Sequence, residues 1–130
     1  PFSHMVTGVV LRAFAAHPEH RKSKEAAVAG GLLASRFFQR DPHPGRNTPA
    51  FWTKFCYPFW FTDLLSSLDS LSLIGFDASN AQIRSGLDWF KERQQKDGTW
   101  KLALLQSVKD KQTSLWVSLA ICRVFKRVYP

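Results

Sequence analysis

The sequence predicts an all-α protein with a single domain of about five helices. Apolar residues recur at intervals of three and four positions, the period of a helix, and nowhere alternate as they would in a half-buried strand. The chain has 130 residues, of which 45% are hydrophobic and 22% charged, a composition typical of one globular domain with its own core. Both observations favour packed helices over a disordered or fibrous chain.

The first residues are set aside in this prediction. Ser3-His4-Met5 resembles the scar left by a cleaved expression tag, so residues 1–5 are treated as a tag remnant. The helical domain is therefore expected over residues 6–130, and we expect it to be a fragment of a longer protein.

Two helices and a long loop are expected in the first half. A helix over residues 6–16 must stop before Pro18, because proline disfavours helical geometry in the residue that precedes it. A second helix begins at the N-cap Ser23 and runs to Gln39. The segment 41–53 holds three prolines and a glycine, which predicts a connection without a helix.

The third expected helix covers residues 57–75. Pro58 would lie in its first turn, where a missing N–H is harmless, and Gly75 would end it. One face is rich in leucine. The other carries a narrow polar stripe at helical spacing, made of Asp63, Ser66, Ser67 and Ser70.

The last two helices differ in character. The fourth begins with a capping box, Ser79-x-x-Gln82, buries one apolar side and ends near Gln95. The fifth runs from Asp110 or Thr113 to Val128 and is apolar on nearly every side, which predicts an inner helix. The alternation suggests two concentric layers, with the second and fourth helices outside and the third and fifth inside.

A faint repeat supports this layering. Gly31-Leu32 and Gln39 have the same mutual spacing as Gly86-Leu87 and Gln94, fifty-five positions later. After Gln39 the pattern is less regular, and Trp52 is the candidate for the tryptophan that would close the first repeat.

The most specific motif lies between Arg84 and Trp100, where an amphipathic helix leads into a glutamine and then a Gly-x-Trp turn. Its key residues are Gly86, Trp89, Phe90, Gln94, Gly98 and Trp100. This pattern resembles the repeat of the squalene cyclases and of the wider terpenoid-cyclase and protein-prenyltransferase superfamily. The resemblance implies a partial α/α toroid of helical hairpins, in which Gln94 and Trp100 join one helix to its neighbour. The alternative is an ordinary amphipathic helix followed by an Asp-Gly turn.

The resemblance does not extend to the chemistry of that superfamily. The cyclases' acidic Asp-x-Asp-Asp signature is absent, and neither Cys56 nor Cys122 has the aspartate two residues earlier that the prenyltransferase zinc site requires. His17 and His20 have a possible ligand spacing, but they lie in a connection without a nearby thiol, so exposed loop histidines are favoured. We therefore expect no catalytic residue, metal or cofactor in this chain.

A dense aromatic cluster occupies residues 51–61. One interpretation is an apolar pocket lined by Trp60, Phe61, Asp63 and Trp116, suited to an isoprenoid or another hydrocarbon ligand. The favoured alternative is packing between loop and core, or a patch covered by another part of the parent protein.

Charge and cysteine content limit the possible partners and compartment. The formal charge of +8 comes from scattered lysines and arginines without an aromatic-basic reader motif, which disfavours nucleic-acid binding. No apolar run is long enough for a transmembrane helix. Cys56 and Cys122 are expected to be buried free thiols, so a cytoplasmic location is predicted. The alternative is a disulfide between them, which depends on the geometry of the fold.

Two functional hypotheses follow. The first is a non-catalytic helical repeat module that binds an apolar or isoprenoid ligand or a partner protein, including a second copy or the rest of the parent chain. The second is a fragment of an isoprenoid-processing enzyme, a terpene cyclase or prenyltransferase, whose catalytic residues lie elsewhere.

Overall fold

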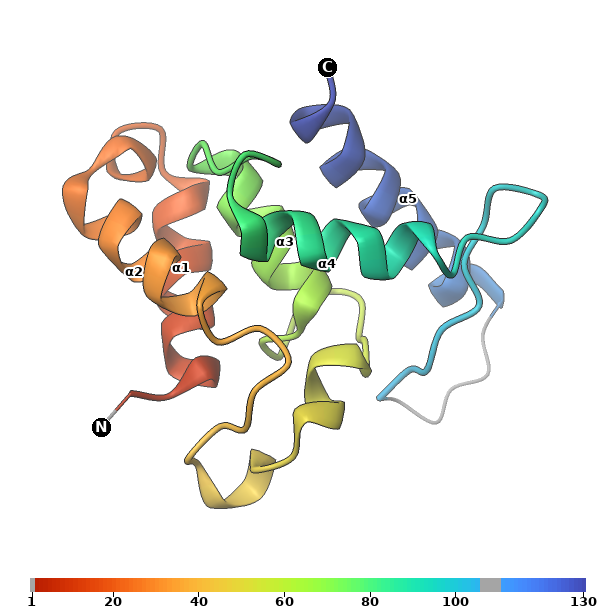
Figure 1. Cartoon of the computed structure of the whole chain (residues 1–130), viewed down its shortest axis with the longest axis horizontal. Helices are drawn as coiled ribbons and strands as arrows, with labels where there is room; N and C mark the ends of the chain where they lie inside the picture. Colours follow the sequence, from red (N-terminus) through yellow and green to blue (C-terminus); the bar gives the residue numbers. More distant parts are fainter. Residues whose placement is uncertain (1, 106–110) are drawn as a thin grey trace.

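The part of the chain that the structure describes folds into five α-helices (Figure 1). The computed structural model describes residues 2–105 and 111–130. The α-helices are α1 (His4–Ala16), α2 (Lys24–Ala34), α3 (Leu64–Leu73), α4 (Ala81–Lys91) and α5 (Lys111–Val128), and the 3-10 helices are η1 (His20–Lys22), η2 (Pro44–Arg46) and η3 (Pro49–Thr53). No strand occurs within the described ranges, only two isolated β-bridges. The prediction of an all-α fold is confirmed.

Helix α3 is the centre of the core. Both α1 and α5 pack along it, α2 packs on α1 and also reaches α3, and α4 crosses in front of α3 in Figure 1. Four leucines of α3 are almost completely buried: Leu64, Leu65, Leu68 and Leu71. Each buried leucine contributes about 1.5–3 kcal/mol of hydrophobic stabilisation. The third helix is therefore buried in the core, while the predicted arrangement in two concentric layers stays a prediction.

The start of α3 differs from the prediction. The helix begins at Leu64, not near Tyr57, because Asp63 is its N-cap. The Asp63 carboxylate accepts the Ser66 N–H at 2.8 Å, and the Ser66 hydroxyl accepts the Asp63 N–H at 3.0 Å. This reciprocal capping box satisfies helix-end donors that the preceding residues cannot satisfy. The Tyr57–Pro58 peptide bond, which is cis, thus lies outside the helix.

The predicted polar stripe on α3 is buried. All four of its side chains are buried, and Asp63 is 0% exposed: Asp63, Ser66, Ser67 and Ser70. Asp63 and Ser66 bond to each other in the cap, so their polarity serves the helix end. At the other end Gly75 adopts φ +103°, and the prediction of a terminal glycine is confirmed.

The N-terminal helices also differ at their ends. Ser3 caps α1 and His4 is buried, so α1 begins earlier than the expected Val6 and includes part of the segment set aside as a tag remnant. Ser23 caps α2 as predicted, by accepting the Ala26 N–H at 3.1 Å. Helix α2 ends at Ala34, before the predicted Gln39, in turns that give Phe38 a φ of +63°.

The cap of α4 is displaced by one residue from the prediction. Asn80, not Ser79, accepts the N–H groups of Gln82 and Ile83, at 3.0 and 3.1 Å. Asn80 is a strong N-cap residue that can bond to two donors at once. The helix ends at Lys91, before the expected Gln95, and buries the predicted apolar side through Ile83, Leu87 and Phe90.

Helix α5 is not buried on every side. Val117, Ala120, Ile121 and Val124 face the core, whereas its opposite side carries exposed apolar residues. The prediction of a wholly inner fifth helix is therefore wrong for the described part of the chain. One of the two predicted start points, Asp110, lies outside the described residues.

Candidate functional site

The Gly-x-Trp motif forms a tight turn at the end of α4. Gln95 and Thr99 pair through a backbone bond of 2.8 Å, and Gly98 adopts φ +85°, a conformation that favours glycine. The Gln94 side-chain amide donates to the Gly98 carbonyl at 3.1 Å. Gln94 is exposed, so it stabilises its own turn and does not bridge two helices as the resemblance implies.

Trp100 makes the link between α4 and α5. Its indole N–H donates to the Phe90 carbonyl at 2.8 Å, and its backbone N–H donates to the Ser118 hydroxyl at 3.0 Å. Both bonds are buried, so they tie the last turn of α4 to the middle of α5 in a region without competing water. Nothing in the sequence pattern identified Ser118 as the partner.

Three other motif residues surround this link. Gly86 lies where a Cβ would be 3.1 Å from a Leu64 methyl and 3.2 Å from a Leu68 methyl, so α4 approaches α3 closely there. Phe90 is buried against Phe55. Trp89 is half-buried, and the Arg93 guanidinium lies 4.1 Å from its ring centroid, a cation–π distance.

A similar tryptophan bond occurs after α2. The buried Trp52 donates its indole N–H to the Gln39 carbonyl at 2.8 Å. However, Gly31 has open space around it, whereas a Cβ on the preceding Gly30 would meet Leu71 of α3 and the side chains of Ile74 and Phe76 just after that helix. Leu32 is exposed, unlike Leu87. The glycine that resembles Gly86 in its packing is thus Gly30, one position from the glycine that the sequence spacing predicts.

The four residues of the expected apolar pocket have different environments. Asp63 is fully buried as the α3 cap, whereas Trp60 and Phe61 are 67% and 40% exposed. Trp116 is 49% exposed and stacks on Tyr57, with ring centroids 6.0 Å apart and planes within 4°. Among the pockets found in the described residues, none is lined by these four residues together.

Helix α5 instead presents an exposed apolar surface. Leu115, Trp116 and Leu119 lie at helical spacing, are between 48% and 58% exposed, and line a shallow hollow with Gln112. We call these three residues the α5 face. The sequence contains a signal for this exposure. The same helical stripe also carries polar and charged residues: Gln112, Arg123 and Lys126.

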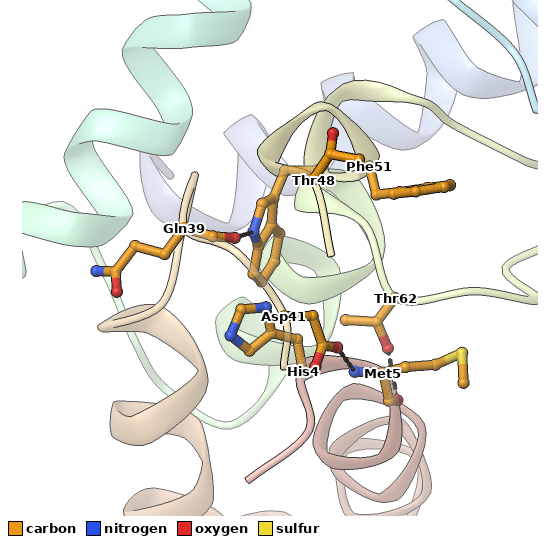
Figure 2. Close-up of a pocket in the computed structure, with 8 residues that line it drawn as sticks. His4, Met5, Gln39, Asp41, Thr48, Phe51 and Thr62 are labelled. Carbon is orange, nitrogen blue, oxygen red and sulfur yellow. Dashed lines mark hydrogen bonds between the residues drawn. The ribbon is translucent and has the colours of Figure 1, made fainter. Parts of the chain in front are cut away.

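A second, small hollow lies at the start of α1 (Figure 2). The buried Asp41 carboxylate accepts the Met5 N–H at 3.3 Å, where the positive end of the helix dipole favours an anion. Thr62 donates to the Met5 carbonyl at 2.8 Å. The His4 ring lies 5.2 Å from that of Trp52. These contacts join α1 to two loops.

Burial determines the ionisation of His4. Desolvation lowers the pKa of the imidazole below its ordinary value, and the nearby Arg36 lowers it further, while Asp41 opposes both. His4 is therefore held toward the neutral form. Sequence reasoning excluded it with the tag remnant, and no motif connects it to Asp41.

No metal site is evident in the described ranges. His17 and His20 lie close together, with ring centroids 4.3 Å apart, and both are exposed. No group of three or more His, Cys, Asp or Glu residues there could hold an ion. Cys56 and Cys122 are free thiols, but only Cys56 is buried, so the expectation of two buried thiols is half right.

Comparison of the chain with protein-family models, curated proteins and solved structures gave no match. The helices of residues 2–105 and 111–130 include none with the length and hydrophobicity needed to cross a bilayer.

Proposed function

We propose that this chain is a non-catalytic helical module that binds an apolar helical segment of another polypeptide through the α5 face. The observation that carries the proposal is the half-exposure of Leu115, Trp116 and Leu119 on one side of a helix whose other side is in the core. Contiguous apolar surface of this kind is typical of interaction sites. A partner helix would insert side chains between these residues.

Packing beneath the α5 face supports a docking role. Val117, Ala120 and Ile121 anchor α5 in the core, and the buried Trp100–Ser118 bond fixes its middle. Tyr57 stacks on one side of Trp116. The face is thus presented on a rigid element, which limits the entropy lost on binding.

The motif resemblance places this proposal within a helical array of the terpenoid-cyclase or prenyltransferase type. In both halves a tryptophan indole donates to a backbone carbonyl, that of Gln39, in the turns after α2, and that of Phe90, in the last turn of α4. Such arrays bury the face of each unit against the next unit. We therefore propose a repeat module rather than a catalytic domain.

The position of Asp63 favours the module over a piece of an isoprenoid-processing enzyme. Its carboxylate is buried and caps α3, so it is poorly placed to protonate a ligand beside Trp60 or Trp116. An isoprenoid chain lying on the α5 face remains the second candidate occupant, because the hollow there is lined mostly by apolar residues.

Binding of a designed helix tests the proposal. An amphipathic peptide with a leucine face and glutamine elsewhere should bind in a fluorescence-anisotropy titration, and Leu119→Ser should weaken binding at least tenfold, by about 1.4 kcal/mol. Val28→Ser, which changes an equally apolar exposed residue on α2, is the matched control and should leave binding unchanged. Equal loss in both variants, or no binding to the wild type, would refute the proposal. Displacement of the peptide by farnesol would favour the isoprenoid alternative.

A further inference from the structure

Cations lie at both ends of the α5 face. Lys111 precedes it by one turn, and Arg123 and Lys126 follow it by one and two turns on the same helical stripe. All three are exposed. The helix contains no aspartate or glutamate along its whole length. Within α5, the charges that flank the apolar surface are therefore all positive.

These three cations are not used within the described fold. The ion pairs among residues 2–105 and 111–130 use Lys91, Arg93 and Arg127. Arg127 lies on the core side of the stripe, where it bonds to Asp69 at 2.6 Å and to the Ser72 hydroxyl at 3.1 Å. Arg127 thus fastens α5 to α3, whereas Lys111, Arg123 and Lys126 point to an external anion.

We propose that the partner of the α5 face is an acidic amphipathic helix, with apolar residues at its centre and Asp or Glu toward both ends. This inference rests on the proposed function and specifies its partner. Lys111 and Lys126 are fifteen residues apart, which corresponds to about 22 Å of helix. A partner helix of about four turns would place carboxylates opposite both ends.

Charge argues against a second copy of this chain as the occupant of the face. It would bring the same cations and a net charge of +8 against themselves. An anionic bilayer would match the charge as an acidic helix does, so the test includes vesicles as a competing occupant.

The test compares three synthetic helices of about 18 residues that share one leucine face and carry Glu, Gln or Lys at the flanking positions. Three exposed ion pairs should make the Glu peptide bind about tenfold more tightly than the Gln peptide at low salt. About 0.5 M NaCl should remove most of this preference by screening. The Lys peptide should bind most weakly.

Variants of the cations complete the test. The double variant Arg123→Glu/Lys126→Glu should abolish the preference for the Glu peptide. Lys22→Glu reverses the charge of an exposed residue on η1, away from the α5 face, and should preserve the preference. Circular dichroism confirms that each variant is folded. Equal binding of the Glu and Gln peptides, lost in Leu119→Ser, would overturn this inference and leave the proposed function standing. Absence of binding to any peptide would overturn both.

Two further results would contradict the acidic helix. One is co-sedimentation with phosphatidylglycerol vesicles that depends on Leu119 while the Glu peptide fails to compete. The other is a dimer in sedimentation equilibrium that Leu119→Ser dissociates and the Glu peptide does not. A monomer that does not sediment with the vesicles and binds the Glu peptide supports the inference.

Discussion

Trp100 donates its indole N–H to the carbonyl of Phe90, at 2.8 Å, in the last turn of α4. Helix ends leave carbonyl groups without the usual partner inside the helix, and this buried one accepts both the Arg93 N–H, at 3.0 Å, and the Trp100 indole. The tryptophan therefore satisfies a helix end while its ring fills the space between α4 and α5. The second bond of Trp100, from its backbone to Ser118, acts on the other helix.

Removing either bond should destabilise the fold. Trp100→Phe removes the indole donor from the buried Phe90 carbonyl, which then keeps only the Arg93 N–H at 3.0 Å. Ser118→Ala leaves the Trp100 N–H without its acceptor. Each should lower the free energy of unfolding by about 1–3 kcal/mol, measured by urea denaturation. Gln94→Ala is the control, since its bond is exposed, and it should cost less than about 1 kcal/mol. A larger loss for Gln94→Ala than for Trp100→Phe would contradict this assignment.

Two adjacent glycines of α2 should respond in opposite ways to alanine. Gly31 has no atom near its missing Cβ, so Gly31→Ala should raise stability by about 0.5–1 kcal/mol through helix propensity. At Gly30 the new Cβ would lie 2.9 Å from carbons of Ile74 and Phe76, so Gly30→Ala should destabilise. Thermal melting of both variants decides the register of the first repeat. Destabilisation by Gly31→Ala and not by Gly30→Ala would restore the register that the sequence spacing predicts.

The role of Asp63 as a cap predicts a graded series. Asp63→Ala should cost about 1–2 kcal/mol of stability, while Asp63→Asn should retain most of it, because asparagine is an equally good N-cap. Urea denaturation gives both values, and peptide binding to the α5 face should be unchanged in Asp63→Asn. If Asp63→Asn abolishes binding with the fold intact, the carboxylate belongs to a ligand site.

Acidification should weaken the fold through His4. The pKa of His4 is lowered by burial and by Arg36, against the effect of Asp41. The unfolded state therefore takes up a proton first as pH falls. The stabilisation that neutral His4 contributes is fully present above about pH 6.5, the pKa of histidine in the unfolded chain. It is lost as the pH falls from there toward the lower pKa of the folded state. The melting temperature between pH 7.5 and 5 should fall more in the wild type than in His4→Gln. If the melting temperatures of the wild type and of His4→Gln depend on pH in the same way, His4 is not the cause of the acid destabilisation.

Features governed by local chemistry were predictable from the sequence. As expected, Ser23 caps the start of α2 and Gly75 follows the end of α3, and the buried side of α4 follows from apolar spacing. The start of α3 was missed because Pro58 was given more weight than Asp63, although an aspartate before an apolar run is itself an N-cap signal.

Features that depend on tertiary contacts were not predictable. Ser118 meets Trp100 across eighteen residues, and Asp41 meets Met5 across thirty-six, without any spacing rule. The apolar content of α5 suggested burial, yet Leu115, Trp116 and Leu119 on one side are about half-exposed. Hydrophobicity indicates that a residue can be buried, and only the arrangement of the helices decides whether it is.

The most direct test of the α5 face is the reactivity of Cys122. Its thiol is exposed and lies at the edge of the same stripe, while Cys56 is buried and provides an internal control. A saturating concentration of the leucine-faced Gln peptide should slow the alkylation of Cys122 by iodoacetamide. Mass spectrometry of the digested protein measures the rate, and the peptide should have no effect on it in Leu119→Ser. An alkylation rate that is unchanged by bound peptide would place the partner elsewhere and contradict the account.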